Sequence, residues 1–276
     1  MTRIMTLVFC IFLLGACAKT HTDSATTPHD TSPSEADIFI ETVKTNYPVT
    51  LSKVADNVWV HTTNYRLPGR EPIPSNGLVV QDGEDIILVD GAWGELATKS
   101  LLLSIKEDIG MDVTKMIITH HHPDRIAGVD VAELEGIEIF THPDTPVLAA
   151  ANGFPVPNTS VASLKEVGAR AKVGNVELSY PGVAHAQDNL IVYIAGANIL
   201  YGGYAVKGVG VKGLGNIVDA DTELWVESLN WVKETYPETK LVVPSHGNGA
   251  DLTLIDDTLA LLTAHNETVK LENIDK

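Results

Sequence analysis

The sequence is poor in cysteine, with two among 276 residues, Cys10 and Cys17. Both lie in or next to an apolar run at the N-terminus. Because no cysteine follows Cys17, the remainder of the chain contains no disulfide and offers no thiolate to a metal. Any metal site in that part depends on histidine and carboxylate side chains.

Basic residues are also scarce. The chain has 19 Lys and Arg against 36 Asp and Glu, which gives a formal charge of -17. A surface of this sign repels phosphate backbones, so we expect no nucleic-acid partner. The 44% of hydrophobic residues excludes a disordered chain and suffices for one large domain or two fused halves.

Long apolar runs are missing too. The run from Ile4 to Leu14 follows Arg3, is too short to span a bilayer, and is typical of a secretory leader. Its end, "LGAC", resembles a bacterial lipobox, in which the leader is cut before a cysteine that is then lipidated. We therefore expect a lipoprotein signal peptide at 1–16, with an ordinary signal peptide as the alternative.

Lipidated Cys17 would attach the protein to a membrane, and Ala18 after it favours the outer membrane. We expect a periplasmic location. Residues 17–45 are read as the lipidated cysteine and a flexible tether, because Ser, Thr, Pro and Asp dominate up to about Asp37. The folded domain is expected at 46–276.

Strand and helix patterns alternate through this domain. Hairpins are predicted at 49–63, 76–90, 169–181 and 189–203, and further strands at 115–120, 137–142 and 240–246. Helices are predicted at 93–109, 125–134, 144–152, 222–236 and 252–265. Strands followed by helices in both halves predict an α+β fold, an αββα sandwich of two packed sheets with helices outside.

Histidines cluster where the predicted strands end. His120, His122 and Asp124 follow one apolar strand, while His185 and His246 follow two others. Such positions can converge on one cavity, and imidazole and carboxylate are ligands that zinc accepts. A single histidine at a strand end is more often solvated or hydrogen-bonded, and we interpret His61, His142 and His265 in that way.

Several motifs together resemble those of a known family. "HHHPDRIAG", "GVAHAQDNLIVY", "LYGGYAVKGVGVKGLGN", "VVPSHG" and "LVDGAW" look like the class B metallo-β-lactamases, in the subclass with two zinc ions and broad substrate range. The match covers roughly residues 46–270. Other hydrolases of this fold usually have a second histidine after the motif aspartate, where this chain has Arg125.

The resemblance implies a zinc-dependent hydrolysis of the β-lactam amide bond, which confers antibiotic resistance. His120, His122 and His185 would hold the first zinc, and Asp124 and His246 the second. Three neutral imidazoles leave one zinc position open for a water that loses its proton near neutral pH and attacks a carbonyl.

The resemblance also assigns substrate contacts. Lys207 would bind the substrate carboxylate and Asn216 would polarise the lactam carbonyl. A surface lysine and a turn-forming asparagine are the alternatives. Residues 61–76 correspond to a substrate-covering loop, in which Tyr65, Leu67 and Pro68 would offer apolar contacts.

Two further residues are expected to support the metals without binding them. Asp90 would hydrogen-bond to ligands from below, and Arg125 would fix the loops under the second zinc. A turn-forming aspartate and a salt bridge elsewhere are the alternatives.

Tyr204 departs from the family pattern, in which a cysteine at this position binds the second zinc. A phenol with an ordinary pKa of about 10 is a poor substitute for a thiolate. We therefore expect one tight zinc and a second, weaker one, with Tyr204 as a doubtful ligand or as a proton donor to the departing nitrogen.

Three functions remain open at this stage. They are β-lactam hydrolysis, hydrolysis of another cyclic ester or amide on the same fold, and metal binding without turnover. In each case we expect a monomer, and for the enzymes a small-molecule substrate.

Overall fold

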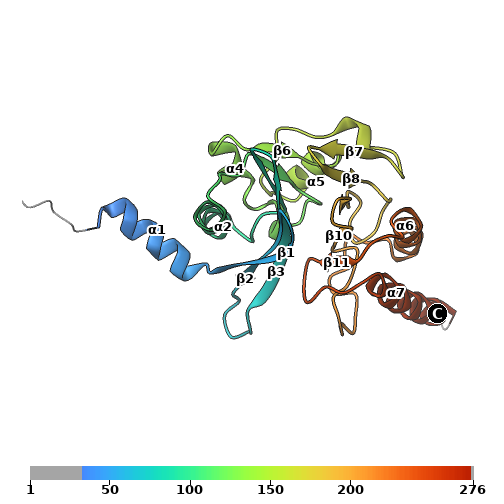
Figure 1. Ribbon diagram of the computed structural model, residues 1–276. Coiled ribbons are helices and arrows are strands. Elements are labelled where there is room, and N and C mark those ends of the chain that lie inside the picture. Colours follow the sequence, from blue (N-terminus) through green and yellow to red (C-terminus); the bar gives the residue numbers. More distant parts are fainter. Residues whose placement is uncertain (1–32, 275–276) are drawn as a thin grey trace, which may run out of the picture.

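Two β-sheets pack face to face in the structure, a computed structural model that describes residues 33–274 (Figure 1). The first sheet has the strand order β1 (Val49–Ala55), β2 (Val58–Tyr65), β3 (Ile73–Asp82), β4 (Asp85–Val89), β5 (Lys115–Ile117) and β6 (Glu138–Phe140). The second sheet has the order β11 (Leu241–Pro244), β10 (Ile199–Gly203), β9 (Ile191–Ile194), β8 (Val176–Ser179) and β7 (Arg170–Val173).

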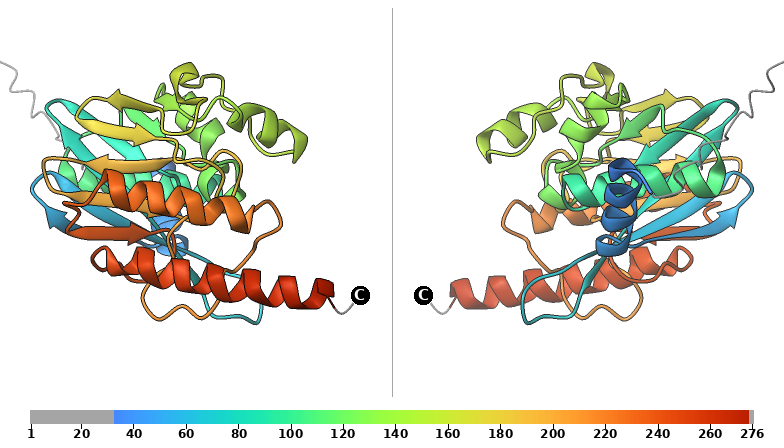
Figure 2. Two further views of the ribbon diagram at one scale, coloured as in Figure 1. Left: turned by 90° about the vertical axis from the view of Figure 1, so that its right-hand side faces the viewer. Right: turned by 90° about the vertical axis from the view of Figure 1, so that its left-hand side faces the viewer.

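Helices cover the outer faces of both sheets. Figure 2 shows α6 and α7 over the second sheet in one view and α2 in front of the first sheet in the other. The helices are α1 (Glu35–Asn46), α2 (Glu95–Ile109), α3 (Pro123–Ile126), α4 (Val129–Leu134), α5 (Thr145–Ala151), α6 (Thr222–Thr235) and α7 (Thr253–Ile274), with one 3-10 turn, η1 (Ala162–Leu164).

Alternating side chains of the strands build the core between these layers. In β4, Ile87 and Val89 face the second sheet, whereas Ile86 and Leu88 face the helices α2 and α4. A third apolar cluster, around Trp225, joins α6 and α7 to the second sheet. Because β4 is buried on both faces, its sequence is a continuous apolar run rather than an alternating one.

The strand directions bring the loops of interest to one edge of the sandwich. Strands β4, β5 and β6 run parallel, and so do β10 and β11. Strand β8 shares the direction of β10, because each pairs antiparallel with β9. Parallel strands end at the same edge of a sheet, so the segments after β4 and β5 lie together, and so do those after β8, β10 and β11. The contact of His122 with His185 joins the two groups of segments.

The predicted αββα sandwich is confirmed, with differences at the level of helices. The segment predicted as one helix at 125–134 forms two short ones, α3 and α4, and α7 continues nine residues beyond 265. Part of the segment predicted as a flexible tether is helical, because α1 begins after the capping residue Ser34 and buries Val43. The predicted signal peptide 1–16, Cys17 and the tether up to residue 32 lie outside the described residues.

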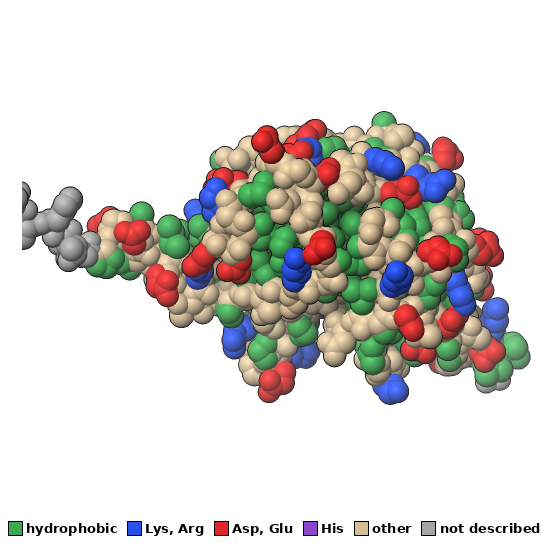
Figure 3. Space-filling view, in the orientation of Figure 1, with side chains coloured by type: hydrophobic (Ala, Val, Ile, Leu, Met, Phe, Trp, Pro, Cys, Tyr) green, Lys and Arg blue, Asp and Glu red, His purple; other side chains and the backbone are tan. Residues whose placement is uncertain are grey.

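Charged side chains are scattered over the surface. Figure 3 shows acidic and basic groups spread over one face, with apolar side chains between them. Within residues 33–274, none of the helices combines the length and the apolar composition that a membrane-spanning helix needs.

Candidate metal centre

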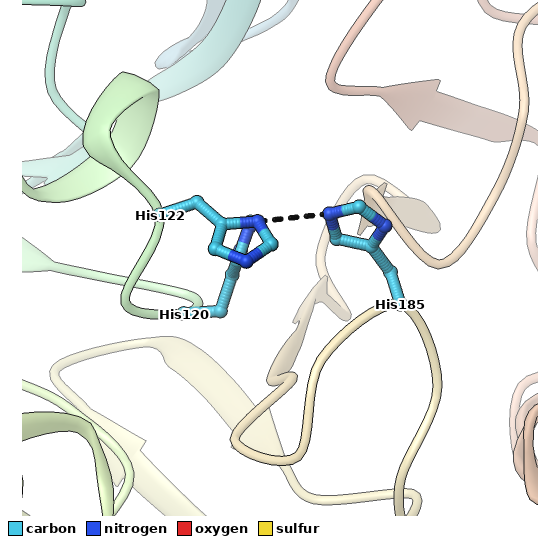
Figure 4. A group of neighbouring side chains, drawn as sticks. All are labelled: His120, His122 and His185. Carbon is cyan, nitrogen blue, oxygen red and sulfur yellow. Dashed lines mark hydrogen bonds between the residues drawn. The ribbon is translucent and has the colours of Figure 1, made fainter. Parts of the chain in front are cut away.

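Three histidines from two loops meet at the common edge of the sheets. His120 and His122 follow β5, and His185 lies in the loop between β8 and β9. Figure 4 shows the three rings turned toward one another. One ligand atom from each lies within 4.8 Å of the others, and Nδ1 of His122 is 3.0 Å from Nε2 of His185.

Burial keeps two of these imidazoles neutral. Desolvation, together with the neighbouring histidines, holds the pKa of His120 well below its ordinary value. Desolvation, followed by the charge of Lys207, lowers the pKa of His185 to about 2. A neutral imidazole keeps a lone pair for a metal.

The three side chains fit a zinc ion. Nε2 of His120 is buried and has no hydrogen-bond partner among the described residues, although buried polar atoms nearly always have one. Ligands of a tetrahedral zinc with bonds of about 2.0–2.1 Å lie roughly 3.3 Å apart, close to the spacing of His122 and His185. The predicted first site is therefore preformed, and a tri-histidine site leaves one zinc position open.

Asp90 lies beneath the histidines and is fully buried. Its carboxylate accepts hydrogen bonds from the backbone N–H and the hydroxyl of Thr119, and from the hydroxyl of Tyr201. Thr119 in turn contacts Nδ1 of His120 at 3.3 Å. Asp90 thus reaches His120 through Thr119. The direct hydrogen bond from Asp90 to a metal ligand that we expected is not present among the described residues.

Arg125 links the loops around this carboxylate. The fully buried guanidinium donates to the backbone oxygen of Asn76, to the hydroxyl of Tyr201, and to Oδ2 of Asp124 at 2.8 Å from Nη2. This network joins the start of α3 to β3 and β10. Arg125 thus contacts three of the segments around the site, and its role under a second zinc stays a prediction.

Asp124 and His246, the predicted second ligand pair, lie 3.4 Å apart from Oδ2 to Nε2, and both contact the hydroxyl of Tyr204. The Tyr204 hydroxyl donates to Oδ2 of Asp124 at 2.8 Å and lies 2.5 Å from Nε2 of His246. Burial opposes a charge on Asp124, but Arg125 and His246 hold the pKa of its carboxyl well below the usual range. Burial, and then Asp124, raise the pKa of Tyr204. Among the described residues, the phenol therefore takes the place between the two side chains as a neutral hydrogen-bonding group.

Lys207 lies beside this group with its ammonium over two aromatic rings. Its Nζ is 4.9 Å from the ring centroid of Trp225 and 5.4 Å from that of Tyr204. No carboxylate of the described residues pairs with it. Burial lowers the pKa of Lys207 to about 8. The side chain is poised to receive an anionic group from a ligand.

Asn216 is exposed, and its side-chain oxygen accepts the N–H of Val218 at 3.2 Å. It closes a turn, and no contact joins it to the three histidines. Its role as a carbonyl-polarising donor stays a prediction.

Only residues 66–72 of the substrate loop predicted at 61–76 form a loop, because the two ends of that range pair within β2 and β3. Tyr65 stacks on Trp93 with ring centroids 4.1 Å apart, and both line a cavity of about 710 Å³. Leu67 is partly buried and Pro68 is exposed. Tyr65, one of the residues predicted to contact the substrate, is therefore held in place by the ring of Trp93.

Two acidic residues near the site were missed by the sequence analysis. Oδ2 of Asp219 lies 2.9 Å from Nε2 of His122, and the fully buried Asp188 lies 2.9 Å from Nδ1 of His121. Asp188 lies within the motif "GVAHAQDNLIVY", three residues after His185, and Asp219 lies three residues after Asn216. These two positions were the only available signal.

The histidines interpreted as unrelated to the metal stand outside the site. His61 is buried, with Nε2 near the backbone oxygens of Val89 and Asp90, and burial lowers its pKa to about 4. His142 is buried and accepts the N–H of Asp144. Neither these two nor His265 belongs to a candidate metal group among the described residues.

Comparison with known proteins places this geometry in context. The sequence profile of the metallo-beta-lactamase superfamily matches residues 70–246. The metallo-beta-lactamase type 2 of Bacillus cereus is 38% identical over 216 residues, which cover 78% of this chain and 82% of that protein.

Solved structures agree in fold. A metallo-beta-lactamase from Hirschia baltica superposes with a TM-score of 0.75 at 30% identity, covering 78% of this chain and 98% of that one. The metallo-beta-lactamase FIM-1 from Pseudomonas aeruginosa, in a mono-zinc form, gives a TM-score of 0.75 at 29% identity over 79% of this chain and 96% of its own.

Proposed function

Because the chain belongs to the metallo-β-lactamase superfamily, we propose that it is a zinc enzyme that hydrolyses the amide bond of β-lactam antibiotics and so confers resistance to them. The observation that carries the proposal is the convergence of His120, His122 and His185, in which two buried ring nitrogens have no hydrogen-bond partner among the described residues. Zinc held there would lower the pKa of a bound water and so supply the nucleophile.

Lys207 binds the carboxylate that β-lactams carry next to the reacting ring. Its ammonium is partly desolvated between Trp225 and Tyr204, and it has no competing carboxylate among the described residues. A charge-assisted hydrogen bond formed in such a setting is stronger than one in open solvent. Lys207 thereby orients the lactam carbonyl toward the three histidines.

Tyr204 supplies the proton that the departing lactam nitrogen needs. Its hydroxyl is neutral, already donates to Asp124, and stacks over His185 with ring centroids 4.2 Å apart. The raised pKa keeps the phenol protonated until the amide bond breaks, when the strongly basic nitrogen takes its proton and the phenolate recovers one from water. The positive charge of Arg125, 5.4 Å from the ring, stabilises the transient phenolate.

The same residue weakens a second zinc at Asp124 and His246. To bind a metal, these two side chains must first give up their contacts with the Tyr204 hydroxyl. We therefore assign catalysis to the three-histidine zinc. Asn216 would add a hydrogen bond to the lactam oxygen after a change in its turn.

We also propose that the protein works in the periplasm as a monomer anchored to the outer membrane through a lipid on Cys17. The support is in the sequence, where a short basic start and an apolar run precede "LGAC". In that compartment the enzyme meets β-lactams before they reach their targets.

A second candidate is the hydrolysis of another cyclic ester or amide, which the replacement of a metal-binding thiolate by Tyr204 favours. One assay separates the candidates. Hydrolysis of a chromogenic cephalosporin and of a chromogenic lactone is measured with and without a chelator. We expect chelator-sensitive turnover of the cephalosporin at a higher kcat/KM than of the lactone. The reverse preference supports the second candidate, and zinc binding without either turnover contradicts both.

A further inference from the structure

His121, the middle of three consecutive histidines, has no part in the site described above. It is 2% exposed, and its Nδ1 lies 2.9 Å from Oδ1 of Asp188. Asp188 also accepts the hydroxyl of Thr145 at 2.8 Å. Because the carboxylate is an acceptor, Nδ1 of His121 carries a proton, and Nε2 is the ring nitrogen left for another partner.

This arrangement is the one that orients metal-binding histidines in proteins. A carboxylate that accepts from one ring nitrogen fixes the tautomer and makes the other nitrogen a better ligand. Nε2 of His121 has no hydrogen-bond partner among the described residues. Its ring lies against that of His122, with centroids 4.7 Å apart.

A carboxylate completes the group. Asp219 lies 2.9 Å from Nε2 of His122, on the side of that ring opposite to His185. The ligand atoms of His121, His122 and Asp219 all lie within 4.8 Å of one another. Asp219 is 38% exposed and lines a cavity of about 410 Å³ that Asp144 and Asp221 also line. This acidic cavity attracts cations, and it meets the group at Asp219.

We propose that His121, His122 and Asp219 form a second metal site, the outer site, for a divalent transition metal such as Zn²⁺ or Cu²⁺. Imidazole and carboxylate ligands suit these ions. The ring of His122 would then bridge two metals, through Nδ1 on the inside and Nε2 on the outside. The incoming ion takes the place of the proton on Nε2, which leaves to solvent.

The outer site needs a small adjustment of the side chains. With metal–ligand bonds of about 2.0–2.2 Å, neighbouring ligand atoms lie roughly 3.5 Å apart, so His121 has to move inward by less than about 2 Å. Water from the cavity fills the remaining positions. Since a proton must be displaced, the outer site is weaker than the three-histidine site.

The alternative place for a second metal is less favourable in this chain. Asp124 and His246 both contact the Tyr204 hydroxyl, so a metal bound there has to displace this hydroxyl from both side chains. At the outer site, by contrast, one nitrogen is already free.

Zinc binding to the metal-free protein tests the outer site by equilibrium dialysis, with the bound metal counted by elemental analysis. His121→Asn keeps an N–H at the position of Nδ1 for Asp188 and removes only Nε2. Asp219→Asn keeps an acceptor for His122 but removes the charge. His246→Asn is the matched control, because it keeps the donor to Pro74 and removes Nε2 on the Asp124 side.

The wild type is expected to bind a second, weaker equivalent of zinc. His121→Asn and Asp219→Asn should lose this second equivalent and keep the first, while His246→Asn keeps both. Circular dichroism checks that each variant is folded. A second equivalent that survives His121→Asn, or a wild type that binds only one, overturns the proposal. The number of bound zinc ions is measured without substrate turnover. If the outer site is absent, the proposed hydrolysis at the three-histidine site is therefore not contradicted.

Discussion

The ammonium group of Lys207 is largely buried, and burial favours its neutral form. Burial lowers its pKa to about 8, so the ammonium is present below this pH and disappears above it. We predict that KM for a β-lactam rises as the pH increases through about 8, because the substrate carboxylate loses its partner. The measurement is a pH profile of KM for a chromogenic cephalosporin.

Two variants of Lys207 separate charge from packing. Lys207→Arg keeps a charge at all these pH values and should flatten the rise of KM. Lys207→Ala should raise KM about 10- to 100-fold at pH 7, as for the loss of a charge-assisted hydrogen bond of about 1.5–3 kcal/mol. An unchanged KM in Lys207→Ala would rule out the proposed contact with the carboxylate.

Tyr204 holds Asp124 and His246 together in place of a metal. Tyr204→Cys removes the bridging hydroxyl and adds a thiolate ligand, so the protein should gain a tight zinc at Asp124 and His246. Tyr204→Phe should lower kcat with little change in KM, because it removes the proton donor and leaves Lys207 in place. Zinc titration and steady-state kinetics measure both effects. A Tyr204→Phe variant with full kcat would exclude the proton-donor role.

Single residues were predictable where a chemical pattern marked them. His120, His122 and His185 could be identified because their type and their place after strands agree, and the structure brings them together. The contact of Tyr204 with Asp124 depends on the path of the loop after β10, which the sequence does not determine. Asp219 and Asp188 were missed because an aspartate in a loop is common and their partners lie far away in the chain.

Strand β3 runs so close to its neighbours that Gly77 leaves no room for a side chain. A Cβ at this position would lie 2.2 Å from the backbone oxygen of Val89 and 2.2 Å from Nε2 of His61. We predict that Gly77→Ala lowers the free energy of unfolding by about 1–3 kcal/mol, since the backbone must shift. Thermal unfolding measures the loss. Gly196→Ala is the matched control, because no atom lies within 4 Å of the Cβ it would add, and an equal Tm for the two variants would contradict this packing.

Elements were predictable where burial leaves a regular pattern. The strands of both sheets and the helices α2 and α6 carry apolar positions at the expected spacing, and the structure contains them. Helix α1 was not expected because it is largely exposed and buries only Val43. The last turns of α7 were missed for the same reason, since residues 266–274 are mostly exposed and polar.

The two-sheet domain is preceded by an N-terminal segment, residues 1–32, for which the sequence predicts a signal peptide and a lipid anchor at Cys17. We predict that Cys17→Ala shifts the protein from the membrane fraction to the soluble periplasmic fraction, because firm attachment requires the acyl chains on this cysteine. Cell fractionation with immunodetection makes the measurement. Wild-type protein found mainly in the soluble fraction would contradict the lipid anchor.

The central claim is that the three-histidine centre binds the zinc that drives hydrolysis. His185→Ala tests it most directly, because His185 belongs to this centre and not to the outer site. Bound zinc and the turnover of a chromogenic cephalosporin are measured on the same folded sample. We predict loss of the tight zinc equivalent and a fall in kcat/KM of at least about 100-fold, which corresponds to about 2.7 kcal/mol of transition-state stabilisation. Full turnover with the tight zinc still bound would contradict the account.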